Sequence, residues 1–298
     1  MENSRFTFID LFAGIGGFHI AMHNIGGTCV FAAEWDKNCR KTYETNFHKI
    51  SPNIFENKES NLFAEDITKV DVELIPNHDV LCAGFPCQPF SQAGYKLGFE
   101  DTRGTLFFNV ADIIRVKKPK AVFLENVRGL LNHDNGKTFN VIKNTLHELG
   151  YSVNYKIIKA SDFGLPQHRP RIYIICIRND IKDTFEFPNS IPLNMTMSDV
   201  FDGAEVNKKI GYTLRVGGKG SPIDDRRNWD GYLVNGEVRR IKPKEGKRMQ
   251  GFPDDFEFPT SDTIAMKQLG NSVAIPAIQA CAEKMIEVLE ENNNGWSK

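Results

Sequence analysis

A single cysteine, Cys87, lies in the segment Gly-Phe-Pro-Cys-Gln-Pro-Phe-Ser at residues 84–91, directly after the apolar run 80–83. The apolar run predicts a buried strand, and the loop after a strand is where an open α/β sheet usually places its chemistry. A cysteine there is a candidate nucleophile, because a thiol loses its proton far more readily than a serine hydroxyl. When this segment is considered alone, a buried structural cysteine is the commoner alternative.

Glycines in the segment 10–18, Asp-Leu-Phe-Ala-Gly-Ile-Gly-Gly-Phe, follow the first predicted strand and open the first predicted helix. Glycines let a ligand approach the backbone closely, and the free N–H groups at a helix start need an acceptor. Such a loop suits a nicotinamide, flavin or adenosylmethionine cofactor. The segment lacks the Gly-x-Gly-x-x-Gly order, which disfavours a hydride-transfer enzyme.

Acidic residues follow the glycine loop at positions that suit a nucleoside. Glu34 ends the next predicted strand, and an acidic residue about 20 positions beyond such a loop commonly binds ribose hydroxyls. Trp35 can stack on an adenine ring, with a half-buried core tryptophan as the alternative. Further along, the segment 65–67, Glu-Asp-Ile, can supply a carboxylate to the adenine amino group.

Strand and helix signals alternate through the first part of the chain. This alternation predicts an α/β fold with a doubly wound, mostly parallel sheet. The predicted strands are 6–9, 28–33, 79–83, 121–124, 153–158 and 171–177, and the predicted helices are 17–25, one through Cys39 and Tyr43, 105–116 and 137–149.

The character of the chain changes at about residue 179. Prolines, glycines and charges become dense, and helical periodicity disappears until residue 261. We expect 179–260 to form a smaller, loop-rich domain, while 1–178 and the C-terminal segment 261–298 together form the catalytic and cofactor-binding domain. The C-terminal segment has one apolar helical face that should pack on the sheet, formed by Ile278, Cys281, Met285 and Leu289.

The net charge of −1 conceals an uneven distribution. Between Lys208 and Arg248 there are twelve basic and five acidic residues, so this segment carries +7 and the remainder −8. Such a split is expected where one part binds a polyanion, and a solvated basic face is the alternative. We expect no membrane span, no signal peptide and no structural metal, and we expect the six scattered cysteines to be reduced residues of a cytoplasmic protein.

Taken in order, the motifs resemble those of the DNA cytosine-5 methyltransferases, especially the small bacterial enzymes of restriction–modification systems. The resemblance spans nearly the whole chain apart from about 180–211. The matching segments are 10–18, 34–36, 66–67, 84–91, 101–107 (Asp-Thr-Arg-Gly-Thr-Leu-Phe), 125–127 (Glu-Asn-Val), 167–171 (Gln-His-Arg-Pro-Arg), 248–253 (Arg-Met-Gln-Gly-Phe-Pro) and 270–273 (Gly-Asn-Ser-Val).

This resemblance implies a Rossmann-like methyltransferase fold with a target-recognition domain, and S-adenosyl-L-methionine as the cofactor. It implies that Cys87 attacks C6 of a flipped-out cytosine and that Glu125 holds N3. Arg169 would contact the cytosine O2 and hold the cysteine and the glutamate, with Arg171 in a supporting position. Strand alternation places both arginines on one face.

The resemblance also implies the residues that bind cofactor and DNA. The expected cofactor-binding residues are Phe12, Ala13, Gly14, Ile15, Gly16, Gly17, Glu34, Trp35, Asp66, Ile67, Leu106, Asn271 and Val273. The expected DNA-binding residues are Gln88, Ser91, Thr213, Arg215, Lys219, Arg226, Arg227 and Asn228. Thr213 would contact a phosphate, arginine and asparagine can recognise purine edges, and the loop 88–99 would close over flipped DNA.

Two alternatives remain open at this stage. A tRNA cytosine-5 methyltransferase of the similar eukaryotic-type subgroup shares the glycine loop and the cysteine, although the basic variable region favours double-stranded DNA. A catalytically silent DNA-binding relative would have no chemical need for Cys87, Glu125 and Arg169. We expect a monomer in the bacterial cytoplasm, associated with the nucleoid through DNA, with a cognate restriction endonuclease that acts on the same site.

Overall fold

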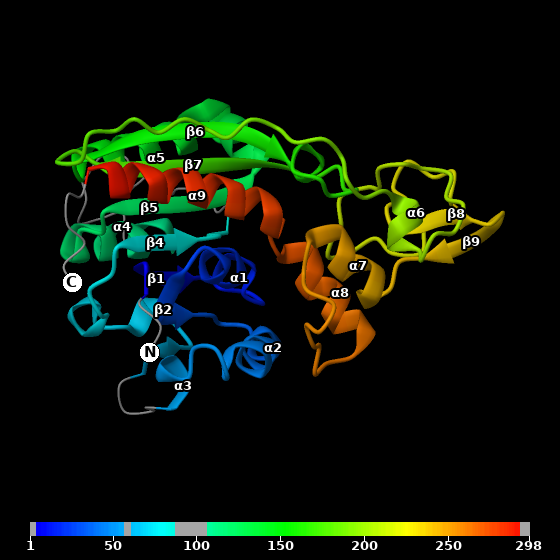
Figure 1. Ribbon diagram of the computed structural model, residues 1–298, viewed down its shortest axis with the longest axis horizontal. Coiled ribbons are helices and arrows are strands. Elements are labelled where there is room, and N and C mark those ends of the chain that lie inside the picture. The colour runs from blue at the N-terminus through cyan, green and yellow to red at the C-terminus, as the bar shows by residue number, and fades with distance from the viewer. Residues whose placement is uncertain (1–3, 57–60, 87–105, 293–298) are drawn as a thin grey trace.

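A mostly parallel sheet of seven strands forms the centre of the described part of the protein (Figure 1). The computed structural model describes residues 4–56, 61–86 and 106–292. The strands of this sheet are β1 (Phe6–Leu11), β2 (Gly27–Ala33), β3 (Phe63–Ala64), β4 (Val80–Ala83), β5 (Ala121–Val127), β6 (Tyr151–Lys159) and β7 (Pro170–Arg178). Their order is β3-β2-β1-β4-β5-β7-β6, and β7 runs antiparallel to both of its neighbours. The predicted fold class is confirmed.

Helices cover both faces of the sheet, because successive strand residues point to opposite sides and both sides are apolar. Phe123 of β5 faces one core, and its neighbours Val122 and Leu124 face the other. The first core is covered by α1 (Gly17–Asn24), α2 (Lys37–Phe47), α3 (Asn53–Glu56) and α9 (Ile275–Glu291), and the second by α4 (Leu106–Lys117) and α5 (Lys137–Glu148). Four short 3-10 turns complete this part: η1 (Ile67–Lys69), η2 (Val72–Leu74), η3 (Arg128–Gly136) and η4 (Ala160–Asp162).

The C-terminal helix α9 closes the first core, as its sequence pattern predicts. Its residues Ile278, Cys281, Met285 and Leu289 are all fully buried. They pack toward α1 and β5, so a helix from the end of the chain covers strands from its first half. The expected docking of this apolar face on the sheet is confirmed.

The carboxyl ends of three parallel strands meet at one edge of the sheet. Leu11 at the end of β1 pairs with Ala83 at the end of β4, and Ala83 pairs with Leu124 of β5. The segments that follow these positions are the glycine loop, the start of the cysteine segment and Glu125. Because parallel register fixes this alignment, all three lie along the same edge.

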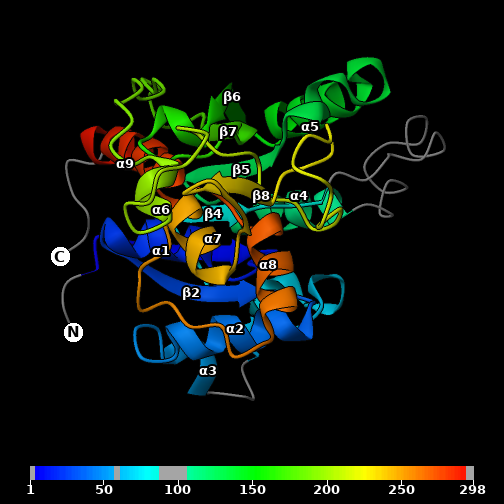
Figure 2. The ribbon, with the colours of Figure 1, turned by 90° about the vertical axis from the view of Figure 1, so that its right-hand side faces the viewer.

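A smaller lobe lies beside this edge of the sheet, at the right of Figure 1, and faces the viewer in Figure 2. It contains α6 (Met197–Val200), the two-stranded ribbon of β8 (Gly231–Val234) and β9 (Glu237–Arg240), α7 (Pro243–Gln250) and α8 (Asp262–Asn271). α7 packs against α8. Thr42 of α2 and Gln268 of α8 exchange side-chain hydrogen bonds, which join the two parts.

Helices α6 and α7 form within 179–260 although the sequence there shows no helical periodicity. The buried face of α7 consists of Glu245, Gly246, Met249 and Gln250, and one apolar side chain is too few to produce a hydrophobic period. Pro243 in the first turn starts the helix instead, together with the Lys242 N–H, which donates to the Glu245 carboxylate at 2.9 Å.

The described residues contain no helix long and apolar enough to cross a membrane. Within the same residues, no group of three or more histidine, cysteine or acidic side chains is arranged to hold a metal ion. The five cysteines that the structure describes are unpaired, and Cys29, Cys82, Cys176 and Cys281 are buried.

We predict that Ile278→Ala, at a fully buried position of α9, lowers the free energy of unfolding by about 2–5 kcal/mol, through lost apolar burial and the cavity left behind. Glu287→Ala on the exposed side of the helix removes an ion pair with Lys284 and should change it by less than about 1 kcal/mol. Urea denaturation of both variants measures the difference. Equal losses would contradict the placement of this face.

Candidate active site and cofactor pocket

A pocket at the carboxyl ends of β1, β2 and β3 gathers many of the expected cofactor residues. It is lined by Phe12, Ala33, Glu34, Trp35, Glu65, Asp66, Ile67 and Leu106. Six of these eight are expected cofactor-binding residues, Glu65 belongs to the segment 65–67 that could supply a carboxylate to the adenine, and Ala33 is an addition. Trp35 is 73% exposed, so the alternative of a half-buried core tryptophan is wrong and its ring is available for stacking.

The glycine loop takes backbone conformations that favour glycine. Gly14 and Gly16 have φ angles of +57° and +85°, in the left-handed region. A Cβ at Gly16 would lie 2.1 Å from the ring of Phe47, so only glycine fits there. Phe12 also has a positive φ, of 54°, and a non-glycine residue in this region is uncommon outside functional loops.

Glu34 holds the glycine loop against the end of β2. One carboxylate oxygen accepts the Gly14 N–H at 2.7 Å, and the other accepts the Asp36 N–H at 2.7 Å. Burial raises the pKa of this carboxyl, and the two N–H donors oppose that shift. Each oxygen retains a second lone pair, so Glu34 can still accept from a ligand hydroxyl.

Asp66 begins the turn η1 on the opposite wall of the pocket. Its carboxylate accepts from the Thr68 hydroxyl and N–H, and the hydroxyl is the main reason that its pKa is lowered. Arg40 of α2 lies behind this wall and donates to the carbonyls of Glu34, Phe63 and Ala64. The sequence motifs do not indicate this role of Arg40, which fixes the ends of β2 and β3 relative to each other.

The segment after α8 packs against the glycine loop. A Cβ at Gly17 would lie 2.6 Å from a methyl group of Val273, so the glycine loop and this segment are in close contact. Asn271 is exposed at the last position of α8. Neither Asn271 nor Val273 belongs to the residues that line the pocket.

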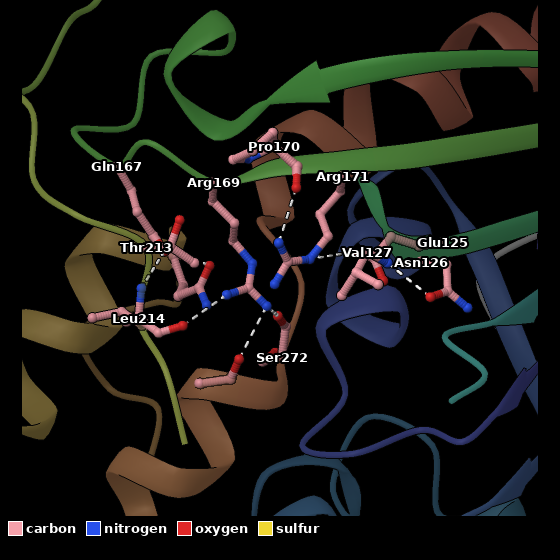
Figure 3. A network of polar contacts seen from close by, with 12 residues as sticks. Glu125, Asn126, Val127, Gln167, Arg169, Pro170, Arg171, Thr213, Leu214 and Ser272 are labelled. Carbon is pink, nitrogen blue, oxygen red and sulfur yellow. Dashed lines mark hydrogen bonds and ion pairs between the residues drawn. The ribbon is translucent and has the colours of Figure 1, made fainter. Parts of the chain in front are cut away.

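Glu125 and Arg171 form a buried pair at the same edge of the sheet (Figure 3). Glu125 is the fifth residue of β5, and the antiparallel register pairs Arg171 of β7 with Val127, two residues further along β5. Arg171 Nε lies 3.2 Å from Glu125 Oε1, yet this oxygen has no hydrogen-bond partner. The contact is therefore an ion pair without hydrogen-bond geometry, and a buried acceptor remains open. Burial raises the Glu125 pKa, and the positive charges of Arg171 and Arg169 oppose the rise.

Arg169 has a different role from the one predicted. Its guanidinium is buried and donates to the backbone carbonyls of Leu214, Gly270 and Ser272. Burial lowers its pKa to about 9. The expectation that Arg169 holds the glutamate is corrected, because Arg171 makes the ion pair with Glu125. The physical reason is position: Arg169 precedes the first residue of β7 and turns toward the small lobe, whereas Arg171 lies within the strand.

Asn126, next to Glu125, positions the segment that leads to the cysteine. Its amide donates to the carbonyl of Phe85 at 2.8 Å and accepts the Val127 N–H at 2.8 Å. Because Phe85 is two residues before Cys87, this bond fixes the start of the cysteine segment relative to β5. Cys87, Gln88, Ser91 and the loop 88–99 lie outside the described residues.

Gln167 is a second positioning residue that sequence reasoning did not assign. Its side chain is fully buried, donates to the Met249 carbonyl at 2.9 Å and accepts the Leu214 N–H at 3.0 Å. Its place two residues before Arg169 in the motif at 167–171 was the available signal. Gln167 and Arg169 thus bind the N–H and the carbonyl of the same residue, Leu214.

The expected DNA-binding residues that the structure describes are of three kinds: exposed, bonded to another group of the protein, or buried. Arg215, Lys219 and Arg226 are exposed, as expected for phosphate or base contacts. Thr213 donates its hydroxyl to the His168 carbonyl, and Arg227 is paired with Asp225.

The prediction that Asn228 binds DNA is corrected. Asn228 is buried, and its amide donates to the carbonyls of Ile223 and Gly231 while its oxygen accepts the Gly231 N–H. This residue holds a turn together and has no donor directed at solvent.

We predict that Arg169→Met lowers the free energy of unfolding by about 3–5 kcal/mol, because three carbonyls would lose their donor. Arg171→Met should cost less than about 2 kcal/mol at neutral pH, because Glu125 can take up a proton when its partner is absent. Urea unfolding followed by tryptophan fluorescence measures both. Equal destabilisation by the two substitutions would contradict this division of roles.

Comparison with known proteins agrees with this geometry. The sequence profile described as C-5 cytosine-specific DNA methylase matches residues 6–219 and 201–287. The type II methyltransferase M.HhaI of Haemophilus parahaemolyticus is 42% identical over 92% of this chain and 92% of its own. The type II methyltransferase M.HpaII of Haemophilus parainfluenzae is 42% identical over 96% of this chain and 90% of its own.

Solved structures share the fold at lower identity. The S. pombe Dnmt2 methyltransferase superposes with a TM-score of 0.71 at 17% identity, over 95% of this chain and 99% of that chain. At this identity the likeness concerns the fold alone. The profile match and the relatives above 40% identity carry the assignment: the chain belongs to the C-5 cytosine-specific DNA methylase family.

Proposed function

We propose that this protein transfers a methyl group from S-adenosyl-L-methionine to C5 of cytosine at specific sites in double-stranded DNA, through a bond between Cys87 and C6 of a flipped-out base. The observation that supports it best is Glu125 Oε1, a buried carboxylate oxygen without a hydrogen-bond partner beside Arg171. Buried acceptors are rarely left open unless a ligand satisfies them. A protonated cytosine N3 is a donor of the required kind.

The residues of the cofactor pocket fit an adenosylmethionine. Trp35 offers an exposed ring to an adenine, Glu34 retains acceptor capacity for ribose hydroxyls, and Asp66 stands on the facing wall. The positive φ angles of Gly14 and Gly16 bring the backbone close to this space. When bound, the cofactor supplies an electrophilic methyl group on its sulfonium.

Cys87 and Glu125 provide the activation that cytosine needs. C5 of cytosine is a weak nucleophile until addition at C6 turns the ring into an enamine. Attack by the Cys87 thiolate at C6 forms that bond and moves an electron pair toward C5, while a proton from Glu125 at N3 neutralises the ring. After C5 has taken the methyl group, a solvent water accepts the C5 proton, and the electron pair of that C–H bond re-forms the C5–C6 double bond as the Cys87 thiolate leaves C6. N3 then returns its proton to Glu125.

Arg171 sets the orientation and the charge of Glu125. Its guanidinium holds the carboxyl at the end of β5 and offers further donors to a carbonyl such as cytosine O2. Asn126 holds Phe85, and so sets where the cysteine segment starts.

The remaining parts of the chain suit a duplex substrate. A base within a duplex cannot reach a buried pocket, so the nucleotide must swing out, at a cost of a few kcal/mol in pairing and stacking. We assign catalysis and cofactor binding to 1–178 with 261–298 and target recognition to 179–260, although α8, the first helix of 261–298, packs against α7 in the small lobe. A monomer suffices for this chemistry, and the activity would protect DNA from a cognate endonuclease in a restriction–modification system.

We predict that the purified protein, given S-adenosylmethionine and unmethylated genomic DNA, produces 5-methylcytosine at one short motif. Base-resolution sequencing of the product measures this. Cys87→Ala should abolish methyl transfer and leave DNA binding largely intact, since the thiol makes the covalent bond and adds little to affinity.

The possible outcomes separate the alternatives. Methylation by Cys87→Ala would contradict the covalent mechanism. Activity on tRNA in a parallel reaction, with none on DNA, would favour a tRNA methyltransferase. Binding without transfer to either substrate would favour a silent DNA-binding relative.

The raised pKa of Glu125 predicts a pH dependence. A raised pKa keeps the carboxyl protonated to higher pH, so single-turnover methylation should fall as pH rises through that pKa. Arg171 lowers this pKa, so Arg171→Gln should raise it. The alkaline limb of the pH–rate profile, where the methylation rate falls, should then move to higher pH, whatever the effect on the maximal rate. Glu125→Gln should lower the rate about 100-fold or more and abolish the limb. An unchanged limb in Glu125→Gln would rule out Glu125 as the proton donor.

A further inference from the structure

Several basic side chains of the small lobe are neutralised within the lobe. Arg240 binds the buried Asp230 at 3.0 Å, and Lys244 and Arg248 both bind Asp202 at 2.7 Å. These cations stabilise the lobe and are poorly placed to contact a ligand. The positive charge of the segment 208–248 therefore overstates what it can offer to DNA.

Arg227 is paired in a different way, because its partner leaves one edge of the guanidinium open. Asp225 accepts from Arg227 Nε at 3.0 and 3.2 Å and from Nη2 at 2.7 Å. The carboxylate thus occupies the Nε–Nη2 edge. Nη1 has no hydrogen bond to the described residues, so the Nη1–Nη2 edge still presents two parallel donors. The Arg227 side chain is 74% exposed and that of Asp225 only 21%.

The backbone around Asp225 is fixed, so the direction of Arg227 is fixed as well. Asp225 Oδ1 also accepts the Arg227 N–H at 2.7 Å, and the Asp225 carbonyl accepts the Asn228 N–H at 2.8 Å. The buried amide of Asn228 joins Ile223 to Gly231. An arginine held in this way loses less side-chain entropy when it binds.

The same loop is closed at its base by buried residues. The Trp229 indole donates to the Gly217 carbonyl at 2.9 Å, and the Trp229 side chain is almost fully buried. Both carboxylate oxygens of Asp230 accept the Gly220 N–H at 3.3 Å. The loop starts at Leu214, which Gln167 and Arg169 fix next to the active site.

The guanidinium of an arginine can bind either a phosphate or a base edge in DNA. The net charge of the Arg227–Asp225 pair indicates which of the two it suits. A phosphate attracts a cation mainly through its net charge, and Asp225 cancels that of Arg227. A base edge is neutral and needs directed donors. Guanine is the base that presents two acceptors, N7 and O6, side by side in the major groove. A fixed, charge-compensated fork therefore suits a guanine better than a phosphate.

We propose that Arg227, held by Asp225, recognises a guanine of the target sequence through N7 and O6. Arg226 beside it is exposed and makes no ion pair or hydrogen bond with the described residues; it contacts phosphate. This inference rests on the proposed function insofar as the substrate is duplex DNA.

The first test compares the sequences that variants methylate in genomic DNA. The wild-type motif should contain an invariant guanine, and Arg227→Ala should lose the preference at that single position while it still methylates the same cytosine. Arg226→Ala is the matched control: it should slow methylation of all sites alike and leave the motif unchanged. Circular dichroism checks that both variants are folded.

The second test removes one acceptor from the DNA. Replacement of that guanine by 7-deazaguanine deletes N7, and should lower kcat/KM of the wild type and of Arg226→Ala by about 10- to 100-fold. Arg227→Ala, which has already lost the contact, should be insensitive to the replacement. Asp225→Asn should bind non-specific DNA more tightly, because a negative charge is removed, yet discriminate less at this position.

Each outcome supports or overturns the inference. An unchanged motif in Arg227→Ala, or equal sensitivity of wild type and Arg227→Ala to 7-deazaguanine, would overturn guanine recognition and leave the proposed function standing. A wild-type protein that methylates no duplex DNA would overturn the proposed function, and this inference with it.

Discussion

The buried guanidinium of Arg169 is the interaction on which the arrangement of the site depends. A charged group in the interior needs several acceptors, and here they come from Leu214, Gly270 and Ser272, in two segments distant in sequence. Arg169 therefore holds both Leu214, where the loop 214–230 begins, and the segment 270–272, which lies beside the glycine loop. The packing is close: a Cβ at Gly270 would lie 2.6 Å from the backbone of Arg215, so Gly270 cannot be larger.

Arg171, two residues after Arg169 and within β7, forms an ion pair with Glu125 of β5. The two Nη atoms of Arg169 donate to three carbonyls, although its Nε has no acceptor, whereas Glu125 Oε1 has no hydrogen-bond donor at all. Its incomplete ion pair costs stability, since burial disfavours the charged carboxylate. Any ligand that donates a hydrogen bond to this oxygen recovers part of that cost.

The parts of the fold and of the site that could be predicted from sequence are those in which a residue type strongly favours one geometry. The alternation of strands and helices, the glycine loop and Glu34 follow from periodicity and from glycine backbone freedom. Helix α7 could not be predicted, because its buried face carries a glutamate, a glycine and a glutamine. The pairing of Glu125 with Arg171 instead of Arg169 could not be predicted for a similar reason: alternation holds within a strand, and Arg169 lies just before β7 begins. Arg227 and Asn228 are adjacent polar residues, so their types do not predict which of them is buried. The backbone conformation of the turn places Asn228 inside and Arg227 outside.

The loop 214–230 is held by hydrogen bonds at both of its ends, while many of its side chains are exposed. Gln167 and Arg169 bind both backbone groups of Leu214 at its start. Arg240 and the Gly220 N–H bind Asp230 at its end. The loop is thus held at both ends by buried polar side chains, Gln167 and Arg169 at one end and Asp230 at the other. Exposed side chains between these ends can therefore be replaced without removing the contacts that hold Leu214 next to Arg169.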